Sequence, residues 1–284
     1  MSTTSAPAPA TEVDPARLHS AFCRAFADYV GGAFHLALAD WPGFLRRQGV
    51  SAEASRVVLQ GEEPIAFAFV APRPARRRWR LATMGAVPEA RGTGAADALM
   101  ADLLARAAAA GMVAAELEVF AQNERASRLY ARHGFEPRWP LHGHAATGGA
   151  ADPGEAPVTV DGPVAQAWLE QAEARLSDLP LQVGAHALAT APPGWQAWQR
   201  GSAQLVWSVD ASGTVQVRSL VDLDPAQHDA EALVHMLVAR QAGATLVVPP
   251  LQRPDLGGDA LERAGWVRQP LWQWLMVRPL APPS

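Results

Sequence analysis

Apolar and polar residues follow one another along this chain in periods that predict alternating helices and strands. Leu18, Phe22 and Phe26 recur at a spacing of four, which places them on one face of a helix expected over 15–30. Three apolar runs with the length of strands follow, bounded by short segments rich in polar residues, Gly or Pro. The expected elements are a short helix at 40–48 and strands at 55–60, 64–71 and 79–87.

The segment 88–134 predicts a loop, a helix, a strand and a second helix, in that order. Apolar residues at helical spacing predict the helix over 95–110, and alternation predicts the strand over 113–120. The second helix is expected at 124–133, because a glycine at its end is typical of helix termination.

The second half of the chain repeats the alternation of strands and helices. Residues 143–160 are rich in Gly, Ala and Pro and lack an apolar period, which is typical of a linker, whereas 1–14 predict a disordered tail. The elements expected after the linker are a helix at 163–176, a hairpin at 203–209 and 214–221, an amphipathic helix around 230–238, a strand at 245–248, a short helix ending at Gly265 and a strand at 271–278. We therefore expect an α/β (α+β) fold in two domains, 15–142 and 161–284.

The amino-acid composition excludes several catalytic mechanisms. All 24 basic residues are arginine, which excludes a Schiff-base lysine, a lysine general base and a P-loop lysine. This usage, with many Ala and Pro residues, is typical of a GC-rich bacterial genome. The net charge of −4 gives no general attraction to nucleic acid or to an anionic membrane, and no run approaches the ~20 apolar residues of a membrane span. Cys23 is the single cysteine, which excludes an internal disulfide and, without a signal-peptide pattern, favours a cytoplasmic location.

A loop of small residues lies between the strand at 79–87 and the helix at 95–110. Its pattern is Arg91-x-x-Gly94-x-Ala96, and such a loop can hold an anion on bare backbone N–H groups at the positive end of a helix dipole. It is not a dinucleotide fingerprint, because Asp97 stands where a third glycine would be needed, and no Gly-Lys-Ser/Thr follows to make a P-loop.

A second pattern follows one helix and one strand later, with Asn123, Tyr130 and Gly134-Phe135 at fixed spacing. Together the two patterns resemble the GNAT family of acyl-CoA-dependent N-acyltransferases, closely over 80–137 and more loosely back to about 15. The resemblance implies a mixed central sheet flanked by helices, with acetyl-CoA as co-substrate. The eight histidines show no metal-ligand spacing, so no metal is expected.

The resemblance also implies a set of residues that bind the cofactor. The strand before the loop would pair its backbone with the pantetheine arm, and the backbone N–H groups after Arg91 would hold the pyrophosphate, to which Arg91 could add a charge-assisted bond. These cofactor-binding residues are Met84, Gly85, Ala86, Arg91, Gly92, Thr93, Gly94, Ala95, Ala96 and Asp97, with Asn123 on the second helix. Gly85 is also consistent with a bulge or with a tolerated glycine, and Asn123 is a good helix N-cap in its own right.

Tyr130 matches the family's general acid, which would protonate the thiolate of CoA as it leaves. Without the motif, a half-buried core aromatic would be the simpler interpretation. Glu118 stands where some members place a general base, and Glu116 could share that role. Both carboxylates could instead face solvent, with water accepting the proton from the amine.

The C-terminal half repeats the order of the first and lacks its glycines. When Pro225 is aligned with Pro88, Glu231 stands at the position of Gly94, and when the glycines are aligned, Leu261 stands at the position of Tyr130. We therefore expect a degenerate second GNAT-like domain that does not bind CoA.

The leading hypothesis is an N-acetyltransferase that transfers an acetyl group directly, in a ternary complex, to a primary amine of a small molecule or peptide. The alternatives are a non-catalytic acyl-CoA-binding or sensing protein, and a nucleic-acid-binding module that uses the basic run 73–80. The charge of the whole chain disfavours the last, and we expect neither a nucleic acid nor a membrane as partner. A monomer and a homodimer both remain open. The acceptor walls are expected to include Tyr29, His35, Trp41 and Trp139.

Overall fold

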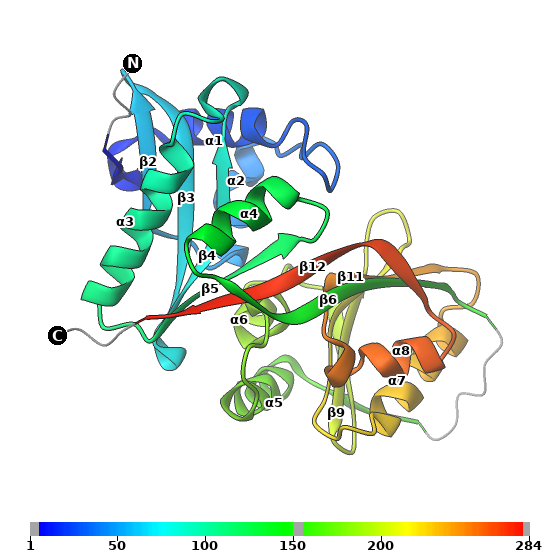
Figure 1. The fold of residues 1–284 in the computed structure, drawn as a ribbon. Helices are drawn as coiled ribbons and strands as arrows, with labels where there is room; N and C mark the ends of the chain where they lie inside the picture. Colours follow the sequence, from blue (N-terminus) through cyan, green and yellow to red (C-terminus); the bar gives the residue numbers. More distant parts are fainter. Residues whose placement is uncertain (1–5, 150–155, 281–284) are drawn as a thin grey trace. The chain divides into compact units, whose positions relative to one another are not determined.

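The computed structural model describes residues 6–149 and 156–280, and the chain divides into two compact units (Figure 1). Met1–Arg138 and Leu275–Ser284 form the first unit, and Trp139–Trp274 form the second. The expected division at 15–142 and 161–284 differs from this in one main respect, because the last residues of the chain belong to the first unit. Sequence patterns could not show this, since pairing between distant strands leaves no local signal.

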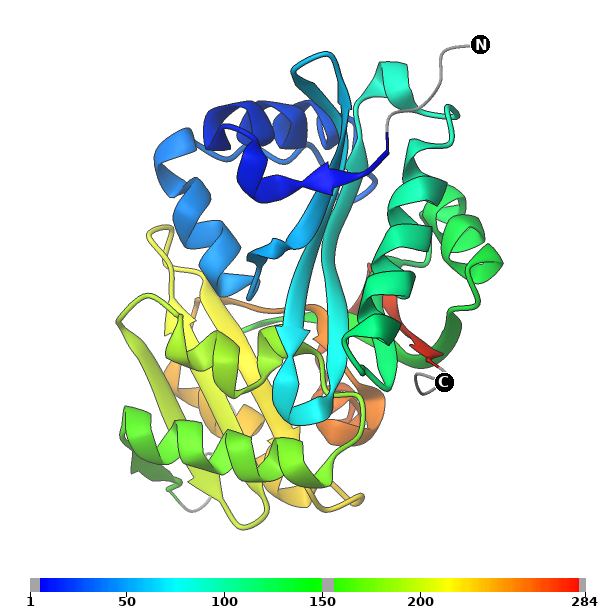
Figure 2. The same cartoon turned by 90° about the vertical axis from the view of Figure 1, so that its left-hand side faces the viewer.

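The first unit contains the predicted series of helices and strands. Its elements are α1 (Pro15–Ala25), α2 (Trp41–Arg47), β2 (Ser51–Gln60), β3 (Glu63–Arg73), β4 (Arg78–Ala86), α3 (Ala95–Ala109), β5 (Ala114–Phe120) and α4 (Glu124–Arg132). The strands β2, β3 and β4 are antiparallel neighbours, and β5 pairs with β4 in parallel. Helices α1 and α2 cover one face of these strands and α3 covers the other (Figure 2).

A cluster of aromatic rings under α1 forms the core on that face of the sheet. Phe22 lies 4.8 Å from Phe26, 5.0 Å from Trp41 and 6.0 Å from Phe67, measured between ring centroids. The repeat of Leu18, Phe22 and Phe26 therefore marks the buried face of α1, as its spacing predicts. Trp41 is 2% exposed, so it belongs to this core and not to an open acceptor wall.

The N-terminal segment is more ordered than its composition predicts. Residues 1–5 lie outside the described part, but Ala8–Pro9 form strand β1, which pairs antiparallel with β2. Ala10 begins a 3-10 turn and is buried against the aromatic core. Proline is compatible with an edge strand because its missing N–H can face away from the ladder, so a Pro-rich segment can still close a sheet edge.

The C-terminal strand β12 (Val267–Pro279) returns to the first unit through Leu275–Pro279. There it neighbours β5, and the Leu280 N–H donates to the Val113 carbonyl over 2.9 Å. The Arg278 guanidinium also donates to the His133 carbonyl at the end of α4. The free edge of β5 is thus paired by a segment more than 100 residues away in sequence, which protects an otherwise open edge.

The second unit contains the other predicted elements and several that the sequence did not reveal. Its elements are most of β6 (Glu136–Thr147), then β7 (Val158–Val160), α5 (Gly162–Arg175), α6 (Ala185–Ala189), β8 (Trp195–Arg200), β9 (Ala203–Val209), β10 (Val215–Asp222), α7 (His228–Arg240), β11 (Thr245–Gln252), α8 (Gly258–Arg263) and the first part of β12. The expected linker 143–160 begins inside β6, which pairs antiparallel with β11, and ends inside β7; residues 150–155 between them lie outside the described part. The part of β6 inside the expected linker contains Gly143, Ala145 and Ala146, which give it no apolar period.

Candidate functional site

The strands β4 and β5 are paired only over their first halves. The pairs run from Arg78↔Ala114 to Leu81↔Leu117 and end there, although β4 continues to Ala86 and β5 to Phe120. On its other side β4 stays paired with β3 as far as Ala86. The last residues of β4 therefore keep backbone N–H and C=O groups that an extended ligand can bind as an added strand would.

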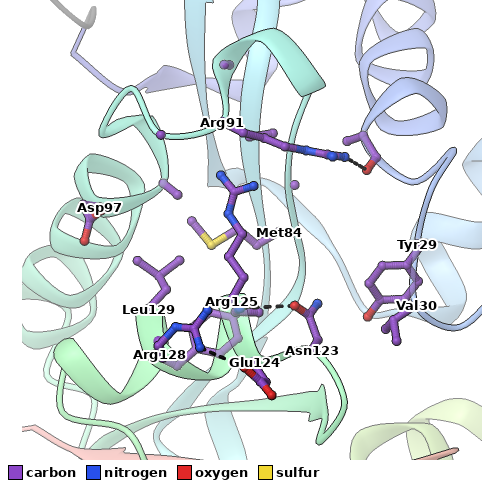
Figure 3. A pocket seen from close by; sticks show the side chains of 18 of the residues that line it. Tyr29, Val30, Met84, Arg91, Asp97, Asn123, Glu124, Arg125, Arg128 and Leu129 are labelled. Atoms are coloured by element: carbon purple, nitrogen blue, oxygen red, sulfur yellow. Dashed lines mark hydrogen bonds and ion pairs between the residues drawn. The ribbon is translucent and has the colours of Figure 1, made fainter.

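A pocket of about 870 Å³ lies beside this end of β4. Four segments form its walls: the end of α1 with the loop after it, the end of β4, the glycine loop, and α4 (Figure 3). The predicted site residues on its walls are Met84, Gly85, Ala86, Arg91, Gly92, Gly94, Ala96, Asp97, Asn123 and Tyr130. Thr93, Ala95 and Glu118 are not on the walls. Tertiary structure thus brings both sequence patterns to one cavity.

The glycine loop has the geometry of an anion site. Gly92 and Gly94 have φ angles of +81° and +90°, which a residue with a Cβ adopts only at a cost. Gly94 is the N-cap of α3, and among the described residues no group accepts a hydrogen bond from the N–H groups of Gly94, Ala95 and Ala96. These donors lie at the positive end of a helix of 15 residues.

Arg91 is held by an acidic residue of the opposite wall. Its guanidinium donates to both carboxylate oxygens of Asp28, each over 2.6 Å, and also to the Ala25 carbonyl over 3.3 Å. The hydrogen bond from Arg91 lowers the pKa of Asp28, and the same bond raises the pKa of Arg91. The predicted bond from Arg91 to a phosphate stays a prediction, and here both terminal nitrogens of Arg91 donate to Asp28.

Gly85 is required by packing within the unit. A Cβ built on it would lie 2.7 Å from the Phe67 ring and 3.0 Å from the Cβ of Ala25. In the ladder Gly85 stands directly opposite Phe67, so that ring and the side chain of α1 occupy the space beside it. The glycine thus allows α1 to approach the end of β4, where the pocket begins.

Asn123 caps α4, as its position predicts. Its side-chain oxygen accepts a hydrogen bond from the Ala126 N–H over 3.2 Å. Asn123 also lies close to the hydroxyl of Tyr29: burial raises the pKa of Tyr29, and interaction with the Asn123 side chain partly opposes this rise. Tyr29 in turn packs against Phe120 at the end of β5, with 5.8 Å between the ring centroids. Asn123 therefore joins the start of α4 to the loop after α1.

Tyr130 lies on the buried face of α4 and reaches the pocket wall. The residue is 8% exposed and its ring is 6.1 Å from that of Phe135. Within the described residues no group bonds its hydroxyl, and burial raises its pKa well above the usual value for tyrosine. The phenol is therefore protonated at neutral pH and has a proton to donate. A phenolate formed there would be poorly solvated and would regain its proton quickly.

Glu118 is engaged away from the pocket. Its carboxylate accepts hydrogen bonds from Arg80, at 2.8 Å from Nε and 2.7 Å from Nη2, and both side chains are at most 4% exposed. Glu116 is paired in the same way with Arg73 at 2.5 Å and Arg78 at 3.0 Å. The two glutamates of β5 thus neutralise arginines of β3 and β4, and the structure does not bring either to the pocket wall.

These pairs also account for most of the basic run 73–80. Arg73, Arg78 and Arg80 point inward to Glu116 and Glu118, and Arg77 donates to the Gly111 carbonyl over 2.8 Å. Arg76 has an interaction partner as well. A run that looks like a basic surface in the sequence is therefore largely an internal ion-pair network, because β4 lies between β3 and β5 and the arginines of β3 and β4 reach the glutamates of β5.

Asp28, Tyr29 and Arg125 are pocket residues that sequence reasoning did not assign to the cofactor. The local pattern gives no signal for Asp28 and Tyr29, since they follow the end of α1 and reach the pocket only through the tertiary fold. Arg125 could have been noticed, because it follows Asn123 by two residues and thus lies in the first turn of α4, close to the capping residue.

In the part of the chain that the structure describes, no group of three or more His, Cys, Asp or Glu side chains is arranged to hold a metal ion. None of the described helices combines the length and apolar character needed to cross a membrane.

The second unit has a helix start in the corresponding place, after β10 and before α7, but the chain's own carboxylate fills it. Asp222 is 1% exposed and accepts hydrogen bonds from the Ala230 N–H of α7 and from the Ser202 hydroxyl. The side chain of Gln252 donates to the Leu220 carbonyl of β10 over 3.1 Å. One backbone N–H at the start of α7 and one carbonyl of β10 are therefore satisfied by side chains of the second unit.

Comparison with known proteins agrees with this geometry. Residues 17–135 match the model of the Acetyltransferase (GNAT) family. No curated protein matches the sequence significantly.

Solved structures of acetyltransferases share the fold over nearly the whole chain. A GCN5-related N-acetyltransferase from Anabaena variabilis is 14% identical with a TM-score of 0.65, covering 95% of this chain and 72% of that one. One from Kribbella flavida is 20% identical with a TM-score of 0.62, covering 94% and 69%. One from Sphaerobacter thermophilus is 16% identical with a TM-score of 0.59, covering 99% and 96%. At these identities the likeness shows the fold alone.

The family match covers the helices, strands and loop that build the pocket, and the fold is that of acetyltransferases. Family and fold together support acyl transfer in general. Residues 17–135 of this chain therefore belong to the GNAT acetyltransferase family.

Proposed function

We propose that the first unit transfers an acetyl group from acetyl-CoA to a primary amine of a small molecule or peptide, with both substrates bound at once. One observation carries the proposal: Gly94 and Ala96, whose backbone N–H groups are free among the described residues, and Tyr130 line one pocket beside the unpaired end of β4. An anion site, a strand edge and a proton donor are the three features that a phosphorylated thioester donor needs.

Each part of the site would bind one part of the donor. The glycine loop would bind the diphosphate through backbone donors, and the end of β4 from Met84 to Ala86 would pair with the amides of the pantetheine arm. This would bring the thioester toward Tyr130. Most of the rate gain would come from holding the thioester and the amine together in the correct orientation.

The chemical step would use few protein groups. The neutral amine attacks the thioester carbonyl, the new C–N bond forms and the C–S bond breaks. Tyr130 donates its proton to the leaving thiolate. The amine loses its own proton to water, because Glu118 and Glu116 are bonded to arginines away from the pocket.

The second unit would be a degenerate copy that does not bind CoA. Both units have an antiparallel strand pair, a helix, a parallel strand and a helix, and in both the parallel pairing covers only the first part of the strands. In the second unit Asp222 accepts a hydrogen bond from a backbone N–H at the start of α7, and Gln252 donates to a carbonyl of β10. Leu261 is fully buried in the second core, which supplies no proton donor there.

The test is a screen of amines with saturating acetyl-CoA, read by release of free thiol and by the mass of the acetylated product. The proposal expects an amine-dependent release of thiol. If CoA binds but no amine in a broad panel is acetylated, the chain is an acyl-CoA-binding or sensing protein. Binding of DNA or RNA has no structural support, since the arginines that would carry it are paired internally.

A further inference from the structure

Four arginines line the pocket, and three of them have a carboxylate partner. Arg91 pairs with Asp28 at 2.6 Å, Arg128 with Glu124 at 3.0 Å and Arg132 with Asp97 at 3.1 Å. The fourth, Arg125, has no ion pair or hydrogen bond to any described group, although it stands only three residues before Arg128 on the same helix. An uncompensated guanidinium in a pocket is a site for an anion.

The side chain of Arg125 is aimed at the glycine loop. Figure 3 shows it extending from the start of α4 across the pocket, so that its guanidinium lies between Met84 and the loop that carries Arg91. The charge of Arg125 is also a minor cause, after the bond from Arg91, of the lowered pKa of Asp28. Its charge therefore acts on the side of the pocket where Arg91 and Asp28 meet.

Two independent groups of donors thus face the same space. Free backbone N–H groups lie at the start of α3, and the Arg125 guanidinium comes from α4. Each carboxylate on the pocket wall is paired with an arginine: Asp28 with Arg91, Asp97 with Arg132 and Glu124 with Arg128. A phosphate between them would accept bonds from both walls and meet no uncompensated negative charge.

We propose that Arg125, and not Arg91, is the cation that binds a phosphate at the nucleotide end of the acyl-CoA donor, while Arg91 neutralises Asp28. The inference rests on the proposed function and names a residue that the family's patterns do not assign in this chain. Two phosphates of the donor share the required chemistry: the diphosphate bridge and the 3′-phosphate monoester. A guanidinium can bind either in a bidentate manner.

The test compares Arg125→Gln with Arg128→Gln, a matched change one turn further along α4 that removes a paired arginine. Affinities for CoA and for 3′-dephospho-CoA are measured by calorimetry. We expect Arg125→Gln to weaken CoA binding about tenfold or more, the size of one charge-assisted bond, and Arg128→Gln to change it less than about twofold. Arg125→Lys should retain part of the lost affinity because it keeps the charge.

Binding of 3′-dephospho-CoA shows which phosphate Arg125 binds. If Arg125 binds the 3′-phosphate, Arg125→Gln weakens CoA but leaves dephospho-CoA unchanged. If it binds the diphosphate, both ligands lose affinity equally. In either case Arg125 is the phosphate-binding cation.

The experiment distinguishes a failure of the Arg125 proposal from a failure of the proposed function. If the wild type binds CoA and Arg125→Gln binds it equally well, the role of Arg125 is refuted and the proposed function stands. If the wild type does not bind CoA at all, the proposed function itself is wrong. Thermal unfolding of each variant shows whether it is folded, and we expect no change for Arg125→Gln because no described group bonds the side chain it alters.

Discussion

Asp28 accepts two hydrogen bonds of 2.6 Å from the guanidinium of Arg91. This ion pair links the loop after α1 to the first residue of the glycine loop, across one end of the pocket. It decides what Arg91 can do for an anionic ligand, because the same donors cannot bind a phosphate at the same time.

Arg91→Gln should weaken CoA binding, even though Arg91 does not contact the ligand in this interpretation. The change leaves the Asp28 carboxylate unpaired beside the phosphate site, and we expect a loss of about fivefold from the added repulsion. The double variant Arg91→Gln/Asp28→Asn should recover most of the affinity, because it removes the repelling charge. Calorimetry measures the CoA affinity of the single variant and of the double variant. A double variant as weak as the single one would show that Arg91 binds the phosphate directly.

Tyr130→Phe should slow acetyl transfer about 100-fold or more while leaving CoA affinity unchanged. The hydroxyl bonds no described group, so its removal should not change the unfolding temperature either. Steady-state kinetics measure the rate of acetyl transfer, calorimetry measures the CoA affinity and a thermal melt measures the unfolding temperature. Unchanged kcat would exclude Tyr130 as the acid, and a large drop in stability would indicate a structural role for the hydroxyl.

Glu118→Ala should destabilise the protein by about 3 to 5 kcal/mol, because Arg80 is 1% exposed and would be left as an uncompensated buried charge. Denaturant unfolding measures the loss. Replacing both partners with apolar residues, as in Glu118→Leu/Arg80→Met, should recover much of it. If Glu118→Ala stays stable and loses activity only at low pH, where the amine needs a base most, the carboxylate is the catalytic base after all.

Gly85→Ala should cost about 1 to 3 kcal/mol of stability, because the new Cβ would overlap the Phe67 ring. In a Phe67→Leu background the same substitution should cost clearly less, since the smaller side chain leaves room. A double-mutant cycle by chemical denaturation gives the coupling between the two positions. Equal costs in both backgrounds would show that the Phe67 contact does not explain the glycine.

The unfolding free energy should fall as the pH is lowered from about 7 to about 5. Burial lowers the pKa of His144 below its ordinary value, and Arg268 lowers it further while Glu262 and Asp259 oppose this. Burial likewise lowers the pKa of His142. Below the ordinary pKa of about 6.5 the unfolded chain binds protons that the folded chain does not, so acid favours unfolding; above it the contribution is constant.

His142→Leu/His144→Leu should flatten this pH dependence, measured by denaturant unfolding at pH 7.5 and 5.5. His35→Leu is the matched control, because His35 is an exposed histidine of the first unit. A double variant with the same slope as the wild type would assign the acid sensitivity to other groups.

Much of the fold was accessible from local patterns. The spacing of Leu18, Phe22 and Phe26 predicts the buried face of α1, and the alternation in 113–120 predicts β5, since both follow from backbone geometry. Composition was a poor guide between the domains: the residues 143–160, expected to be a linker, include the last residues of β6, where Gly143, Ala145 and Ala146 give no apolar period. A strand such as β12 can be recognised in the sequence, but the strand with which it pairs cannot.

The sequence by itself determined the chemistry that the pocket offers: a loop of small residues that can take positive φ angles, a capping asparagine, and a tyrosine two helical turns later. These depend on residue type and spacing, which the chain carries locally. Only the tertiary structure decided which charges are free. It pairs Glu118 with Arg80 and Arg91 with Asp28, and leaves Arg125 without a partner, because ion pairing depends on distances between segments that are far apart in sequence.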